Sequence, residues 1–166
     1  MLIRSSLPLL FLFILYSCNN IPQHITTGME GKPLPAIDLL LPDSLTHINT
    51  RDVDKSTSTV LMYVDPGCHF CQAQLKELKS KIAMIPNIHF YIFTSSSVKQ
   101  TRQLDEALGL DGYRNLYVGI DTKKTFADYF NPPGFPYTAV YRSDQKLKAV
   151  FLGKTDLKEI ERATKD

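Results

Sequence analysis

The stretch Thr59-Val60-Leu61-Met62-Tyr63-Val64-Asp65-Pro66-Gly67-Cys68-His69-Phe70-Cys71 decides the fold. Its first six residues are mostly apolar, β-branched or aromatic, which predicts a buried strand. Asp65-Pro66-Gly67 ends that strand in a turn. Apolar side chains then recur at helical spacing, which predicts a helix from about Cys68 to Ile85 that Pro86-Asn87 stops.

Two cysteines, Cys68 and Cys71, stand where this strand passes into the helix. A cysteine in the first helical turn faces unpaired backbone N–H groups and the positive end of the helix dipole, which favour thiolate over thiol. The second cysteine lies about one turn further on, so its sulfur can reach the first. We therefore expect Cys68 to attack a disulfide and Cys71 to resolve the mixed disulfide. A protonated His69 would add positive charge beside Cys68.

Three other interpretations of this pair stay open. A structural disulfide is one, although a bridge across two residues removes little entropy from the unfolded chain. A structural zinc site is another, but it needs four ligands, and the sequence has no second Cys-x-x-Cys or paired-histidine motif. The third is a pair without redox activity. We expect no metal and no cofactor, and interpret His24, His47 and His89 as ordinary surface or packed side chains.

The rest of the chain alternates between strand and helix patterns. Strands are expected over 36–41, 88–93, 116–120, 137–142 and 147–152, with a weaker one over 47–49. Further helices are expected over 98–108, over 122–130 and after Thr155-Asp156. This order predicts an α/β sandwich whose central mixed sheet has an antiparallel edge at the C-terminal end.

Two separated motifs give the chain a resemblance to the thioredoxin superfamily. The first is Cys68-His69-Phe70-Cys71 after a strand, and the second is Gly134-Phe135-Pro136-Tyr137-Thr138 before one. The resemblance implies a three-layer α/β/α sandwich with a cis-proline, Pro136, beside the cysteine pair. It also implies that the backbone of Phe135 binds an extended partner peptide and that the proline keeps metal off the thiols.

The spacing of the motifs is similar to that of the exported, membrane-tethered TlpA/ResA type. Cys71 and Pro136 are 65 residues apart, which leaves room for an inserted helix and strand, and Gly31-Lys32-Pro33-Leu34-Pro35 also looks like that type. Four positions depart from the family pattern. Met62 and Gln74 stand where acids are common, Gly67 replaces a tryptophan and Phe70 a proline. Neither Met62 nor Gln74 can take a proton from Cys71.

The N-terminal segment is expected to be an export signal. Arg4 precedes an apolar run over 7–16 of about ten residues, or about 15 Å as a helix, half of what a membrane span requires. Ser17-Cys18 resembles the lipobox of bacterial lipoproteins, in which the cysteine becomes the lipidated first residue. The alternative is a plain signal peptide. Lipidation of Cys18 would leave Cys68 and Cys71 as the only pair in an oxidising compartment.

These features divide the chain into a lipoprotein signal peptide over 1–17, a tether over 18–35 and a domain over 36–166. The tether assignment rests on the glycines and prolines among its polar residues. Anchoring through Cys18 would hold the domain at a bacterial membrane facing the periplasm. Asn19 is not the aspartate that retains such lipoproteins at the inner membrane of enteric bacteria, which favours the outer membrane.

Composition excludes several classes of protein. The chain has 166 residues, enough for one domain, and 19 Lys+Arg against 17 Asp+Glu give a net charge of +2. No basic cluster marks a nucleic-acid site. A hydrophobic content of 43% is inconsistent with disorder.

The resulting hypothesis is a lipid-anchored thiol–disulfide oxidoreductase, acting as a reductant on exported proteins. Its partners would be protein disulfides or thiols and an upstream thiol electron donor. Two alternatives are a peroxiredoxin-like peroxide reductase and a non-enzymatic binding lipoprotein. The first rests on the Pro-Gly-Cys sequence, although the charge of Asp65 opposes thiolate formation. The binding lipoprotein is suggested by Met62 and Gln74, which stand where the family commonly has acids. The Pro136 loop would then be its docking surface.

Overall fold

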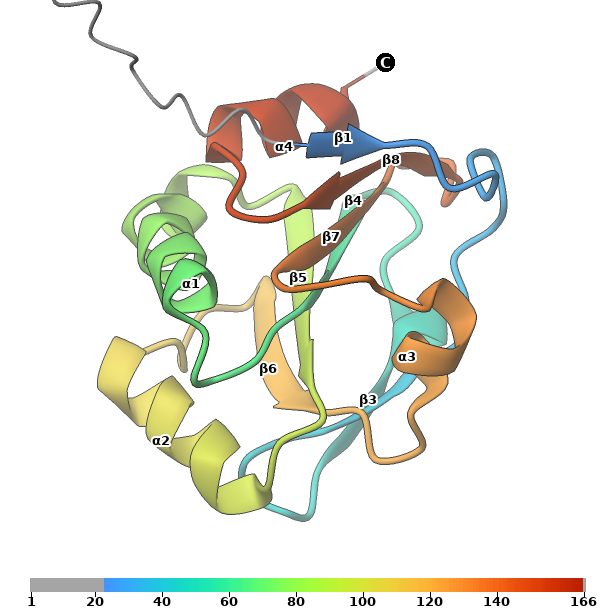
Figure 1. Ribbon diagram of the computed structural model, residues 1–166. Coiled ribbons are helices and arrows are strands. Elements are labelled where there is room, and N and C mark those ends of the chain that lie inside the picture. Colours follow the sequence, from blue (N-terminus) through green and yellow to red (C-terminus); the bar gives the residue numbers. More distant parts are fainter. Residues whose placement is uncertain (1–22, 166) are drawn as a thin grey trace, which may run out of the picture.

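A computed structural model describes residues 23–165, and Figure 1 shows its arrangement. The strands within that range are β1 (Gln23–Ile25), β2 (Asp38–Leu40), β3 (His47–Asn49), β4 (Ser58–Tyr63), β5 (Ile88–Thr94), β6 (Leu116–Ile120), β7 (Tyr137–Tyr141) and β8 (Leu147–Leu152). The helices are α1 (His69–Lys81), α2 (Val98–Leu108), α3 (Thr125–Phe130) and α4 (Leu157–Thr164), with 3-10 turns at Thr50–Asp52 and Ile82–Met84.

The strands form one mixed sheet in the order β1-β8-β7-β4-β5-β6-β2-β3. β4, β5 and β6 pair in parallel, whereas β7 runs antiparallel to both β4 and β8. The predicted antiparallel hairpin at the C-terminal end is therefore confirmed. The opposite flank is antiparallel as well, because β2 pairs with both β3 and β6 in that sense.

Helices cover both faces of the sheet, so the predicted three-layer sandwich is confirmed. On one face, α1, α2 and α4 pack their apolar side chains against residues such as Val60 and Phe90. On the other face, Phe126 and Phe130 of α3 pack against residues such as Leu61 and Phe93. Figure 1 shows α1 and α2 on one side of the sheet and α3 on the other.

Local backbone and capping features set the ends of three of the helices. α1 ends at Lys81, four residues before the predicted end, and a 3-10 turn completes the connection. α2 has a capping box between Ser97 and Gln100, and Gly109 closes it in a left-handed conformation with φ 56°. α3 begins at Thr125, later than predicted, because Lys124 has a left-handed backbone.

The domain begins earlier than the predicted boundary at residue 36. Gln23–Ile25 pairs as β1 with β8, and the backbone N–H of Gly31 donates to the carbonyl of Leu147 at 2.8 Å. Ile25, Met29 and Leu34 pack on the core. The part of the expected tether over 23–35 is thus an edge of the folded domain, because the open backbone of β8 accepts it as another strand.

Residues 1–22 lie outside the described residues, and with them the predicted signal peptide over 1–17 and the predicted lipidation site, Cys18. Among the described helices, none combines the length and the apolar character that crossing a bilayer requires.

Candidate functional site

The loop between β4 and α1 is fixed by hydrogen bonds to its own backbone. The Asp65 carboxylate accepts from the N–H of Gly67 at 2.7 Å, and the Asp65 carbonyl accepts from the N–H of Cys68 at 3.0 Å. The Gln72 side chain donates to the carbonyl of Pro66 at 2.8 Å. Cys68 is therefore presented at a defined position at the end of the buried strand.

Cys68 is the N-cap residue of α1, with φ −79° and ψ 118°. Its Sγ accepts a hydrogen bond from the backbone N–H of Cys71 at 3.3 Å. Cys68 is half-buried, whereas Cys71 is only 1% exposed and belongs to the core beneath the helix. The predicted asymmetry between an accessible thiol and a shielded one is present in this geometry.

Burial raises the pKa of the Cys71 thiol, and its hydrogen bond with Cys68 raises it further. Cys71 therefore keeps its proton at neutral pH. Met62, at the position where an acid is common in the family resembled, is fully buried among apolar side chains. That position supplies no proton acceptor.

The Pro136 loop lies at the same edge of the sheet as the cysteines. Tyr137, the first residue of β7, is paired with Tyr63, the last residue of β4, so the residues just before β7 lie beside the start of the cysteine loop. The Phe135–Pro136 peptide is cis, as the resemblance implies. The Pro136 carbonyl accepts from the N–H of Gly153 at 2.8 Å, which ties the loop to the end of β8.

Two aromatic side chains near this edge are exposed. Phe70, between the cysteines, is 54% exposed, and Phe135 is 40% exposed. The Phe135 ring lies 5.4 Å from the ring of Tyr63, and the Phe70 ring lies edge-on to His69 with 6.3 Å between centroids. Exposed aromatic rings beside the half-buried Cys68 offer apolar contact area to a partner.

The sequence matches no protein-family model and no curated protein. Solved structures do match. One is the thioredoxin domain of a thiol-disulfide oxidoreductase from Bacteroides vulgatus, with a TM-score of 0.66 and 17% identity over 82% of this chain and 98% of that one. The chain has a thioredoxin-like fold.

Two further structures share the thioredoxin-like fold. A secreted disulfide oxidoreductase from Mycobacterium tuberculosis, described as homologous to E. coli DsbE, has a TM-score of 0.61 and 18% identity over 78% of this chain and 93% of that one. Peroxidoxin BcpB from the same organism has a TM-score of 0.66 and 13% identity over 82% of this chain and 94% of its own chain. At these identities the likeness establishes the fold and leaves the chemistry to the site.

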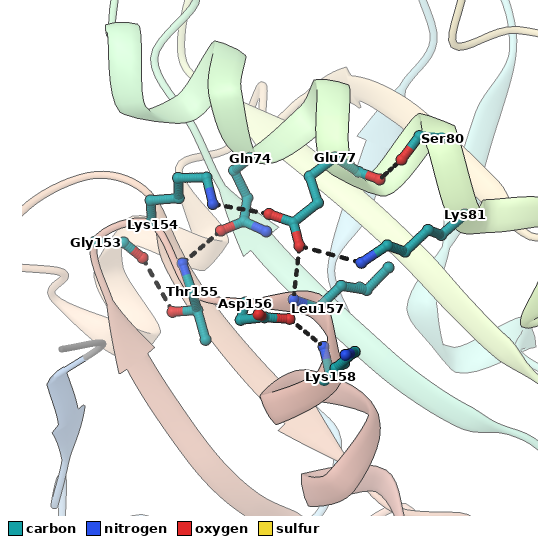
Figure 2. A network of polar contacts seen from close by, with 10 residues as sticks. All are labelled: Gln74, Glu77, Ser80, Lys81, Gly153, Lys154, Thr155, Asp156, Leu157 and Lys158. Carbon is teal, nitrogen blue, oxygen red and sulfur yellow. Dashed lines mark hydrogen bonds and ion pairs between the residues drawn. The ribbon is translucent and has the colours of Figure 1, made fainter. Parts of the chain in front are cut away.

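A polar network behind the cysteines was not predicted from the sequence. In Figure 2, Gln74 and Glu77 of α1 extend toward the connection between β8 and α4. Gln74 is fully buried, and its Oε1 accepts from the N–H of Thr155 at 2.7 Å. Glu77 accepts from the N–H of Leu157 at 3.1 Å and from Lys154 at 2.7 Å. Glu77 also forms an ion pair with Lys81 at 3.5 Å, and the Glu77 side chain is half-buried.

Both side chains thus hold α4 of the thioredoxin-like fold against α1. Only the N-cap residue Asp156, which starts α4, gave a sequence signal for this junction. The amide of Gln74 has no titratable group in the physiological range, so it cannot act as the base that a glutamate there could provide.

The described residues contain no group of three or more His, Cys, Asp or Glu side chains placed to hold a metal ion. Cys68 and Cys71 supply two sulfur ligands, and a structural zinc site needs four ligands.

Proposed function

We propose that this chain is a protein thiol–disulfide oxidoreductase in which Cys68 is the nucleophile and Cys71 the resolving thiol. The observation that carries the proposal is the hydrogen bond from the Cys71 N–H to the Cys68 sulfur. A backbone donor at a helix N-terminus favours negative charge on the sulfur that it contacts. The buried Cys71 beneath it is one helical turn away and so stands ready for the second step.

In the proposed direction the protein acts as a reductant. The Cys68 thiolate attacks one sulfur of a partner disulfide, a mixed disulfide forms, and the other partner sulfur leaves and takes up a proton. Cys71 then loses its proton, its sulfur attacks Cys68 Sγ, and the released partner thiolate accepts a proton. The partner gains two electrons and two protons, and the protein is left with a Cys68–Cys71 disulfide. An upstream thiol donor reduces that disulfide.

The partner is proposed to lie across Phe135 and Pro136. Their loop is held beside the cysteine loop by the pairing of β7 with β4, and the Phe135 ring is partly exposed there. Phe70 would add apolar contact, and His69, when protonated, would strengthen the thiolate character of Cys68. No cofactor takes part in this exchange.

The site of action is proposed to be outside the cytoplasm, with the domain attached to a bacterial membrane through a lipid on Cys18 and facing the periplasm. The apolar run over 7–16 and the Ser17-Cys18 junction support this. An oxidising compartment is also where exported proteins form the disulfides that such an enzyme acts on.

The proposal is tested by assaying the purified protein against a protein disulfide substrate with dithiothreitol as donor. Cys68→Ser should reduce turnover to the uncatalysed rate, because Cys71, the other thiol among residues 23–165, is buried. Cys71→Ser should still attack and should accumulate a mixed disulfide with the substrate, visible on a non-reducing gel. Full reductase activity in Cys68→Ser would disprove the assignment, and inert thiols would favour a binding protein.

Peroxide reduction is the second candidate function. Pro66-Gly67 directly precedes Cys68, and the fold is shared with a peroxidoxin. Against it, Asp65 stands three residues before Cys68, and a carboxylate there opposes thiolate formation. A peroxide-consumption assay on the same preparation distinguishes the two, since the disulfide reductase proposed above should consume peroxide no faster than free thiol does.

A further inference from the structure

A groove lies between α1 and α2 and reaches the cysteine loop. Its volume is about 430 Å³, and its lining includes Pro66 and Gly67, which directly precede Cys68. Figure 1 shows α1 and α2 next to each other on the same side of the sheet. Cys68 is one residue, or about 3.8 Å between Cα atoms, from the lining residue Gly67. A substrate polypeptide joined to Cys68 through a mixed disulfide would therefore have the residues beside its own cysteine near the mouth of this groove.

The groove carries positive charge without a balancing carboxylate. Lys76 of α1 lines it, and none of its lining residues is acidic. The residues of α2 that line it share one helical face, whereas Asp105 and Glu106 fall outside that set. The described side chains offer Lys76 no ion-pair partner closer than 4.0 Å. An anionic group on a ligand would meet a free ammonium there.

The other lining groups suit a polypeptide backbone. Gln72 and Gln103 place amide side chains at the groove, and such groups both donate and accept hydrogen bonds. Leu104 and Leu108 provide an apolar floor. The lined part of α2 runs from Gln100 to Leu108, about 12 Å of helix, which matches about three to four residues of extended chain.

We propose that this groove binds the substrate polypeptide beside its reacting cysteine, as an extended segment that carries an acidic side chain paired with Lys76. The proposal rests on the thiol–disulfide exchange proposed above and names the substrate class for the same site. It places the acidic segment on the α1–α2 side of Cys68, away from the Phe135–Pro136 loop.

The test compares three synthetic peptides that each hold one cysteine as a mixed disulfide with a small thiol. The residues flanking the cysteine are acidic in one peptide, amide-bearing in the second and basic in the third. Wild-type protein should reduce the acidic peptide with a kcat/KM about fivefold above that of the amide-bearing one, and added salt should lessen this preference. Lys76→Glu should reverse the preference, so that the basic peptide is reduced faster than the acidic one. Lys158→Glu is the matched control and should keep the wild-type preference.

Lys158 is an exposed residue of α4, so its reversal changes net charge equally without altering the groove. Equal rates for all three peptides, or an unchanged preference in Lys76→Glu, would overturn the proposal. Reduction of a small uncharged disulfide tests the exchange reaction itself and should be the same in wild-type protein and in Lys158→Glu.

A redox-independent measurement separates the two proposals. The acidic peptide with serine in place of cysteine cannot react. It should still shift the NMR signals of Lys76 and Gln103 in wild-type protein, and it should leave the Gln103 signals of Lys76→Glu unshifted. Loss of small-disulfide reduction with these shifts retained would disprove the enzyme and keep the groove. Absence of the shifts in wild-type protein would disprove the groove.

Discussion

The two cysteines of one helical turn are given different properties by their surroundings. Cys68, at the N-cap, receives the N–H of Cys71 and remains partly accessible, whereas Cys71 points into the core. The first property suits the attack proposed for Cys68, and the second shields the thiol that is proposed to resolve the mixed disulfide. The proton that Cys71 must lose in the proposed second step has to go to a group other than Met62 or Gln74, because neither side chain is a base.

At the residue scale, the raised pKa of Cys71 predicts its alkylation behaviour. In Cys68→Ser, burial, the larger cause, remains, so the rate of reaction with iodoacetamide should keep rising with pH beyond the ordinary thiol value of 9.0. The same variant unfolded in urea should react faster at every pH and level off near that value. A folded-state rate that levels off at or below pH 9 would contradict the account.

At the scale of elements, the carboxylate of Glu77 is one of the two side chains that hold α4 against α1. Burial by itself raises the pKa of Glu77, but hydrogen bonds from Lys154 and from the N–H of Leu157 outweigh it and hold the pKa below its ordinary value of 4.5. Because the folded-state pKa is the lower one, the ionised carboxylate stabilises the fold above that value. This contribution is lost as the pH falls through the folded-state pKa.

Glu77→Gln should therefore lower the free energy of unfolding by about 1–2 kcal/mol at pH 7, with the difference shrinking below about pH 4. Urea denaturation at several pH values measures this. Glu159→Gln, which removes an exposed pair with Arg162, serves as control and should change stability by less than about 1 kcal/mol. If the stability difference between wild-type protein and Glu77→Gln grows as the pH falls, the ionised Glu77 carboxylate does not stabilise the fold.

At the scale of the whole molecule, the sheet brings together two segments that are far apart in the sequence. Pairing of β4 with both β5 and β7 places the end of the buried strand beside the start of β7, so the cysteine loop and the Pro136 loop share one edge. Packing between α1 and the sheet buries Cys71. Cys68 and Phe135, in the loops at the edge of the sheet, stay partly exposed.

Much of this arrangement was predictable because it depends on local patterns. The apolar run before Cys68 predicted a strand, and Asp65-Pro66-Gly67 predicted the turn that ends it, from neighbouring residues alone. β1 was missed because three residues, Gln23–Ile25, give no periodicity, and their strand exists only through pairing with β8.

The junction between Gln74 and Thr155 was missed for a related reason. It joins positions 81 residues apart, and nothing local to either residue signals the contact. The groove beside Lys76 likewise exists only once α1 and α2 pack side by side. Features made by tertiary contacts between polar residues are thus the part that sequence patterns do not encode.

The most direct test of a redox-active Cys68–Cys71 pair is its equilibration with glutathione buffers of increasing oxidation, followed by acid quenching, alkylation and mass analysis. A redox-active pair should give one reversible two-electron transition that yields a disulfide between the two cysteines, absent in Cys71→Ser. A midpoint near about −270 mV would fit the proposed reductant, whereas one near about −120 mV would mark an oxidant. If both thiols stay alkylatable across all buffers, Cys68 and Cys71 are not a redox-active pair.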